Sequence, residues 1–109
     1  MSRLTARFWV DAYLTRLRLA DVAAFVVTHG DDTAGSVVVK LNTLDGKAQL
    51  FERSYNLLED SHSWNAVLTD VEDAVDAAVT RRREVDRDLW VIEVEDRAGR
   101  HMLDAPGIA

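Results

Sequence analysis

Residues 36–54, SVVVKLNTLDGKAQLFERS, predict a β-hairpin and decide the fold class. Over residues 36–42 the side chains alternate between two faces, as they do in a β-strand. Leu44-Asp45-Gly46 is a strong turn signal, and residues 47–54 form the predicted returning strand. An antiparallel strand pair is therefore the framework on which the rest of the chain can be placed.

Outward from this hairpin, the spacing of apolar residues predicts one helix before it and one after it. The first helix is expected over about residues 5–20, and the second begins after the capping residue Asp70 and ends near Arg83. A polar loop is expected over residues 55–63. The remaining predicted strands cover residues 24–28, 64–68, 89–96 and 101–103. The order α-β-β-β-β-α-β-β predicts an α+β fold, with two helices packed on an antiparallel or mixed sheet of five to six strands.

The whole chain, residues 1–109, is expected to form a single compact domain. Its length is typical of one domain, and no linker or low-complexity tract divides it. Pro106, the single proline, lies in a tail of about residues 104–109 that is expected to fray.

Composition removes several classes of site. The chain has no cysteine, which excludes disulfides and thiolate metal sites. Its longest apolar run, residues 22–27, is too short for a signal sequence or a membrane span, so a cytoplasmic protein without membrane contact is expected. No phosphate-binding or dinucleotide fingerprint is present, and no cofactor is predicted.

Charge does not favour nucleic acid as a partner. The net charge is −6, which repels a polyanion unless the basic residues gather on one face. Residues 81–83 are three consecutive arginines, but they end the second predicted helix, whose first turns carry Asp70, Glu72 and Asp73. The helix dipole favours this distribution without any ligand.

The first predicted helix carries apolar residues on two sides. Its main stripe includes Tyr13 and Leu17, and a second line lies on the far side. That second line, with Trp9 on its border, is the candidate interaction surface: Phe8, Trp9, Ala12 and Leu19. Either the line is buried within the monomer, or it contacts a protein partner or a second copy in a homodimer.

Carboxylates form a second candidate site. Glu93 and Glu95 share one face of a predicted strand, about 7 Å apart, a spacing that suits a hard divalent cation or an acid–base pair. Asp31 and Asp32 follow His29 in a glycine turn and offer further oxygen ligands. The alternative is that the strand carboxylates form a solvated face and that the aspartates stabilise the turn. No metal-ligand spacing motif is matched.

Three segments carry a resemblance to a known family. They are LTARFWV over residues 4–10, GDDTAGSV over 30–37 and DLWVIEVEDRAGR over 88–100. On these segments the chain resembles a bacterial family of unknown function, domain-of-unknown-function family 1491. The resemblance implies a single compact bacterial domain and implies no activity, cofactor or partner.

These observations favour a small non-enzymatic binding or protein-interaction module that docks or self-associates through the first helix. The alternative hypothesis is a metal-dependent hydrolase or nuclease that uses Asp31, Asp32, Glu93 and Glu95. The two hypotheses differ in whether these four carboxylates converge.

Overall fold

The hairpin predicted from residues 36–54 lies within the central sheet. Val39 and Phe51 stand opposite each other in its two antiparallel strands. Leu44 (φ 61°) and Gly46 (φ 85°) take left-handed backbone conformations in the turn, as tight hairpin turns require. This computed structural model describes residues 4–108. Its elements are α1 (Ala6–Leu19), β1 (Ala23–Thr28), β2 (Val37–Asn42), β3 (Lys47–Asn56), β4 (Ser61–Val71), α2 (Glu72–Val85) and β5 (Trp90–Glu95).

The last strand along the chain enters the middle of the sheet. The strand order is β1-β5-β2-β3-β4, and β5 pairs antiparallel with β1 and parallel with β2. Residues 90–92 are buried, which fits a strand covered on both faces. The sheet is therefore mixed, and it has five strands, the lower of the two expected numbers. Residues 101–103 take no strand conformation, and Met102 instead bends the chain with a φ of 62°.

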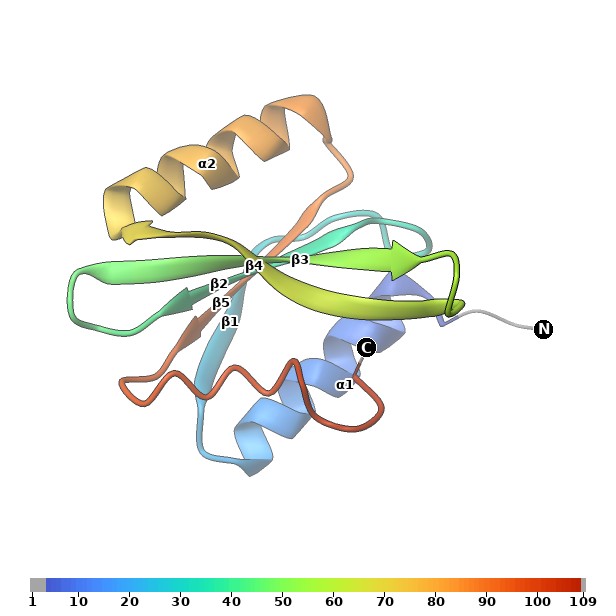
Figure 1. Cartoon of the computed structure of the whole chain (residues 1–109), viewed down its shortest axis with the longest axis horizontal. Coiled ribbons are helices and arrows are strands. Elements are labelled where there is room, and N and C mark those ends of the chain that lie inside the picture. The colour runs from blue at the N-terminus through green and yellow to red at the C-terminus, as the bar shows by residue number, and fades with distance from the viewer. Residues whose placement is uncertain (1–3, 109) are drawn as a thin grey trace.

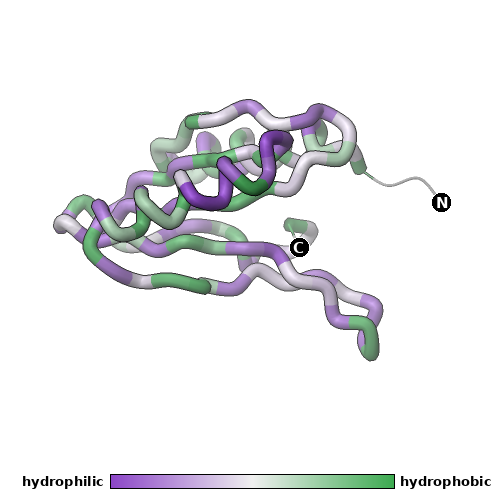
Figure 2. Tube along the Cα trace, turned by 90° about the horizontal axis from the view of Figure 1, so that it is seen from above, coloured by the Kyte–Doolittle hydropathy of each residue, from purple (hydrophilic) through white to green (hydrophobic). Residues whose placement is uncertain are grey.

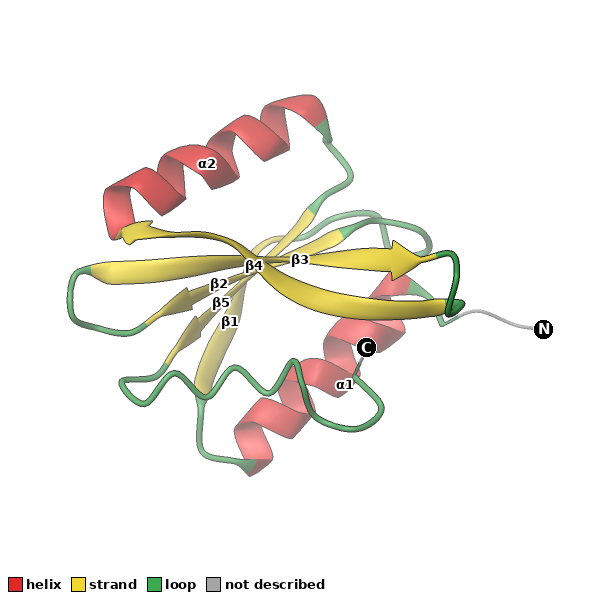
Figure 3. Cartoon of the chain, in the orientation of Figure 1, coloured by secondary structure: helices red, strands yellow, loops and turns green. Residues whose placement is uncertain are grey.

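The two helices cover opposite faces of this sheet (Figures 1 and 3). Leu17 of α1 belongs to the core on one face, together with Ile92 of β5. Val75 of α2 belongs to the core on the other face, together with Val91. Each of these four side chains is at most 1% exposed, and full burial of one such side chain contributes about 2 kcal/mol. Because successive side chains of β5 point to opposite faces of the sheet, this strand contributes residues to both cores.

The hairpin of β3 and β4 is longer than predicted. The expected loop over residues 55–63 is wrong, because backbone pairing continues to Asn56 and Ser61 and leaves only residues 57–60 for the turn. Both faces of this end are solvated, so its strands lack the apolar alternation that marks a half-buried strand. Leu57 is 83% exposed and Leu58 98% exposed. The hydrophobic tip projects from the body of the molecule in Figure 2.

The C-terminal segment, the tail that was expected to fray, lies against α1 over residues 104–108. Residue 109 lies outside the described residues. The indole N–H of Trp9 donates to the carbonyl of Ile108 at 2.8 Å, and the Tyr13 hydroxyl donates to the carbonyl of His101 at 2.6 Å. Ile108 is only 4% exposed. These bonds hold the tail on one flank of α1.

The loop between β1 and β2 lies tightly against the start of β5. A Cβ atom built on Gly30 would lie 2.2 Å from the carbonyl oxygen of Asp88, and one on Gly35 would lie 2.5 Å from the same atom. Neither glycine takes a positive φ. Glycine is therefore needed at these two positions because the two backbones lie too close for a Cβ atom, and not because of a left-handed turn.

Candidate interaction surface

The outer side of α1 carries an exposed apolar line that consists of Phe8, Ala12 and Leu19 and is called the outer line below. Phe8 is 59% exposed and Leu19 is 80% exposed. Residues eleven positions apart in a helix lie about 20° apart around its axis and about 16 Å apart along it. Tyr13 and Leu17 are fully buried on the side that faces the sheet. The second line predicted from the sequence is therefore open to solvent among the described residues.

Trp9 does not belong to this line. It is 7% exposed and stacks on Tyr13, with ring centroids 4.9 Å apart, and on Trp64, with centroids 5.2 Å apart. Because Trp9 lies at the border between the two apolar sides of the helix, the sequence did not decide which side its ring would join. The C-terminal segment decides it, because the carbonyl of Ile108 accepts the indole N–H. Trp9 is thus a core residue that joins α1, β4 and the tail.

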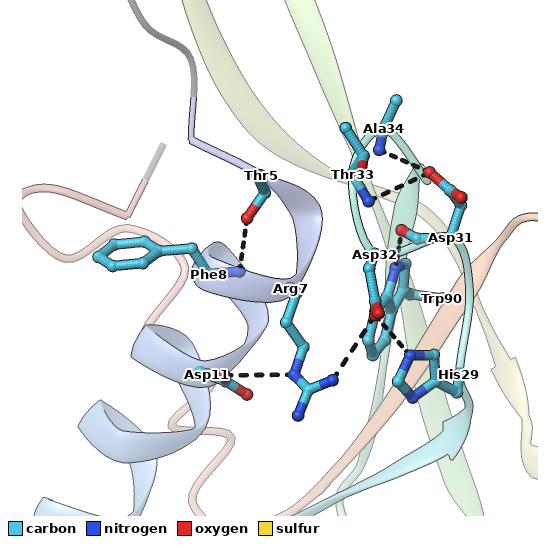
Figure 4. A network of polar contacts seen from close by, with 10 residues as sticks. All are labelled: Thr5, Arg7, Phe8, Asp11, His29, Asp31, Asp32, Thr33, Ala34 and Trp90. Atoms are coloured by element: carbon cyan, nitrogen blue, oxygen red, sulfur yellow. Dashed lines mark hydrogen bonds and ion pairs between the residues drawn. The ribbon is translucent and has the colours of Figure 1, made fainter.

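Asp31 and Asp32 are occupied within their own loop (Figure 4). Asp31 accepts hydrogen bonds from the backbone N–H groups of residues 33 and 34, at 3.1 and 2.8 Å. Asp32 lies 2.7 Å from His29 and 3.7 Å from Arg7 of α1. The hydrogen bond to His29, with the charge of Arg7 nearby, holds the pKa of Asp32 below its usual range. The predicted turn-stabilising role accounts for both carboxylates.

Glu93 faces a buried lysine that sequence reasoning did not single out. The ammonium of Lys40 lies 2.7 Å from Glu72, 2.6 Å from Asp76 and 3.3 Å from Glu93. Lys40 is only 4% exposed. Burial alone would lower the pKa of Lys40, but the hydrogen bonds to Asp76 and Glu72 raise it above its ordinary value. This Lys40 cluster fastens α2 to β2 and β5. Its carboxylates come from α2 and β5, so strand alternation alone could not reveal it.

The four candidate carboxylates do not converge. The backbone N–H of Asp31 donates to Asp88, which precedes β5, whereas Glu95 is the last residue of β5. Five strand steps separate the ends of β5, a distance of about 16 Å. No group of three or more His, Asp or Glu side chains that could hold a metal ion is found in residues 4–108. The arrangement gives the metal-dependent hypothesis no support.

The arginine run is also accounted for locally. The guanidinium of Arg82 forms an ion pair with Glu52 of β3, and Arg82 and Arg83 lie in the last turn of α2. Both positions follow the preference of a helix C-terminus for positive charge.

Within residues 4–108, no helix is long and apolar enough to cross a membrane.

A small hollow lies between the tail and β4. Its volume is about 230 Å³, below the usual range of small-molecule sites. Trp64 lines it, and the indole Nε1 of Trp64 is buried without a hydrogen-bond partner among the described residues.

One exposed surface was missed in the sequence. Strand β1 is at the edge of the sheet, and it exposes Phe25 (46%), Val26 (37%) and Val27 (48%). The run contains no charge and no proline, although edge strands usually carry one or the other. Only the insertion of β5 inside the sheet reveals that β1 is an edge. The sequence signal, an uncharged β-branched run, is equally typical of a central strand.

The comparisons with known proteins agree with this fold. A crystal structure of a DUF1491 family protein from Caulobacter crescentus CB15 is 35% identical, with a TM-score of 0.86, covering 95% of this chain and 98% of that one. An NMR structure of a DUF1491 family protein from Caulobacter crescentus CB15 is 34% identical, with a TM-score of 0.81 and 97% of each chain covered. Protein Atu0922 from A. tumefaciens, solved in solution, is 26% identical, with a TM-score of 0.73 and 86% of each chain covered.

No match was found among curated proteins. The family model for proteins of unknown function DUF1491 matches residues 4–104. The chain therefore belongs to the DUF1491 family, as the resemblance in its three segments implied.

Proposed function

We propose that this chain is a non-enzymatic protein-interaction module that docks an amphipathic helix of another protein on the outer line of α1. The observation that carries the proposal is the exposure of Phe8 and Leu19, 59% and 80%, on one side of a regular helix. Exposed apolar surface that gathers on one side of a helix marks an interaction site, and Ala12 between the two large side chains makes this line continuous.

The shape of the line fits a helix as the partner. Ala12 and Thr15 lie between the two large side chains, and the hydroxyl of Thr15 already donates to the carbonyl of Asp11 at 2.9 Å. The small side chains at the centre of the line therefore leave a depression between Phe8 and Leu19, and the one hydroxyl there already has a hydrogen-bond partner. A large apolar side chain of a partner helix fits between Phe8 and Leu19, as ridges pack into grooves.

A cytoplasmic setting fits this proposal, because a cysteine-free domain needs no oxidising compartment. Within residues 4–108, no cluster of carboxylates that could hold a metal ion supports the metal-dependent alternative.

Site-specific photo-crosslinking tests the proposal. A photoreactive amino acid at position 15 should crosslink a partner in cells, and mass spectrometry should map the crosslink to an amphipathic helix of that partner. The same amino acid at position 83, on the exposed last turn of α2, is the matched control. The Phe8→Ser/Leu19→Ser variant should fold normally by circular dichroism and lose the crosslink. A crosslink that survives this double substitution would overturn the proposal.

A further inference from the structure

Strand β1 provides a weakly protected edge beside α1. Outside its pairing with β5, its free side carries backbone N–H and C=O groups that no strand of the described chain pairs. Its sequence, AAFVVT, lacks the lysine or proline that usually protects an edge. The one protective feature is a bulge between Val26 and Thr28. A strand of this kind is a template for a further strand.

We infer that β1 pairs with β1 of a second copy of this chain, in an antiparallel homodimer with a continuous sheet. This inference goes beyond the proposed function, because it uses a different side of α1 and a different partner. Three observations favour a second copy over an unrelated strand.

The first observation is the distribution of side-chain size along β1. The strand begins with the small residues Ala23 and Ala24 and continues with the exposed, larger Phe25, Val26 and Val27. A two-fold axis at Phe25 places Val26 and Val27 of one copy against the small residues Ala24 and Ala23 of the other. The strand is therefore complementary in shape to itself in the antiparallel orientation.

The second observation is a groove at this edge. It has a volume of about 550 Å³ and is lined by Leu14 and Arg18 of α1 and by Ala23 and Ala24 of β1, among others. These contacts show that the Arg18 side of α1 is turned toward the free edge. In an antiparallel pair whose two-fold axis passes at Phe25, Val26 of the second copy lies opposite Ala24, on the same face of the sheet, and extends toward this groove.

The third observation is the charge on this side of α1. Asp11 and Arg18 are seven residues apart, so they lie within about 20° of each other around the helix. Arg18 forms no ion pair with any residue from 4 to 108, and Asp11 has only an exposed contact with Arg7 at 3.4 Å. When two such helices lie antiparallel, Asp11 of each copy lies opposite Arg18 of the other.

One two-fold axis satisfies both the strand and the helix. The midpoint between Asp11 and Arg18 lies about 7 Å before the end of α1, at 1.5 Å per residue. Phe25, where the two-fold axis of the strand pair lies, is about 7 Å after the first residue of β1, at 3.3 Å per residue. Because α1 and β1 are joined by a short turn and α1 packs against β1, the two midpoints lie at nearly the same level.

The size of the interface sets its strength. About ten residues of each copy take part, whereas a standard stable interface uses about 20–30 on each side. We therefore expect a weak dimer, with a dissociation constant between about 10 μM and 1 mM. Sedimentation of the full chain across that range should show a reversible monomer–dimer equilibrium, and a chain that stays monomeric at about 1 mM overturns the inference.

Charge reversal tests the geometry. Asp11→Arg and Arg18→Asp should each weaken dimerisation by about tenfold, since each substitution changes two symmetry-related pairs. An equimolar mixture of the two variants should form a heterodimer of wild-type strength, because both cross-pairs are then opposite in charge. Arg83→Glu, an exposed reversal on α2, is the control and should have no effect. A mixture no stronger than the separate variants overturns the inference.

A separate variant tests the strand. Phe25→Lys puts a charge on the free edge, and because Phe25 is 46% exposed the lysine can extend into solvent in the monomer. This variant should remain folded and lose the dimer. In the wild type, the backbone amides of residues 23–28 should exchange hydrogen more slowly as protein concentration rises. A dimer that tolerates Phe25→Lys, or whose β1 amides exchange as they do in the monomer, overturns the inference.

Discussion

Replacement of Lys40 by methionine should destabilise the chain strongly. Methionine retains the apolar volume but removes the ammonium that lies within 3.3 Å of Glu72, Asp76 and Glu93. Loss of one partner from a fully buried ion pair costs about 3–5 kcal/mol. The side chains of Glu72 and Asp76 are 36% and 53% exposed, so water screens them, and most of the cost comes from Glu93, which is 14% exposed. We therefore expect a loss of about 2–4 kcal/mol at neutral pH.

Urea denaturation followed by circular dichroism measures this loss. With a slope of about 1–1.5 kcal/mol/M for a domain of this size, the midpoint should fall by roughly 2 M. The other lysine, Lys47, is exposed, and Lys47→Met should change the free energy of unfolding by less than about 0.5 kcal/mol.

The cause of the loss can be tested separately. If an unpaired carboxylate at Glu93 is the cause, adding Glu93→Gln to Lys40→Met should recover part of the lost stability, because the double variant buries no unpaired charge. The reasoning is refuted if Lys40→Met costs less than about 1 kcal/mol, or if the two substitutions simply add.

Three further predictions concern the loop, the tail and the final turn. Trp9→Phe removes the indole hydrogen bond to the tail, and limited proteolysis should then cleave the last residues faster, with a cost of about 1–2 kcal/mol in stability. Gly30→Ala places a Cβ 2.2 Å from the carbonyl oxygen of Asp88, and thermal melting should show a loss of at least about 2 kcal/mol. Hydrogen bonds from Arg100 lower the pKa of Asp96, so its contribution is present above about pH 4, the unfolded value, and is lost as pH falls through the folded pKa. Asp96→Asn should therefore be less stable at neutral pH and lose less stability on acidification, as acid titration of the melting temperature would show.

Local patterns were sufficient to predict most of the elements. The hairpin turn at Leu44–Gly46, the apolar stripes of both helices and the alternation of β5 each reflect neighbouring residues in the chain. The outer line of α1 was also predictable from local sequence, because a helix places Phe8 and Leu19 on one side whatever the helix packs against. Its exposure, by contrast, depended on what the tail and sheet would cover.

Features that depend on distant residues were not predictable in this way. The position of β5 between β1 and β2 pairs residues more than fifty positions apart, and it alone makes β1 an edge. The burial of Lys40 depends on α2 lying over β2, and the burial of Ile108 depends on Trp9 at the other end of the chain. In each case, contacts between segments far apart in the chain decided the outcome.

The two proposed surfaces share α1 without sharing residues, and this leads to a last prediction. In the antiparallel dimer both α1 helices lie on the same face of the continuous sheet, so their outer lines lie side by side. One line presents only two large side chains, far less than the roughly 800 Å² per partner of a stable interface, whereas the pair doubles the apolar area offered to a partner helix. Dimerisation should therefore strengthen partner binding, by linkage. The Phe25→Lys variant, whose outer line is intact, should give a weaker photo-crosslink from position 15 than the wild type at equal concentration. An undiminished crosslink from a strictly monomeric Phe25→Lys chain would show that a single outer line suffices and that the two surfaces act independently.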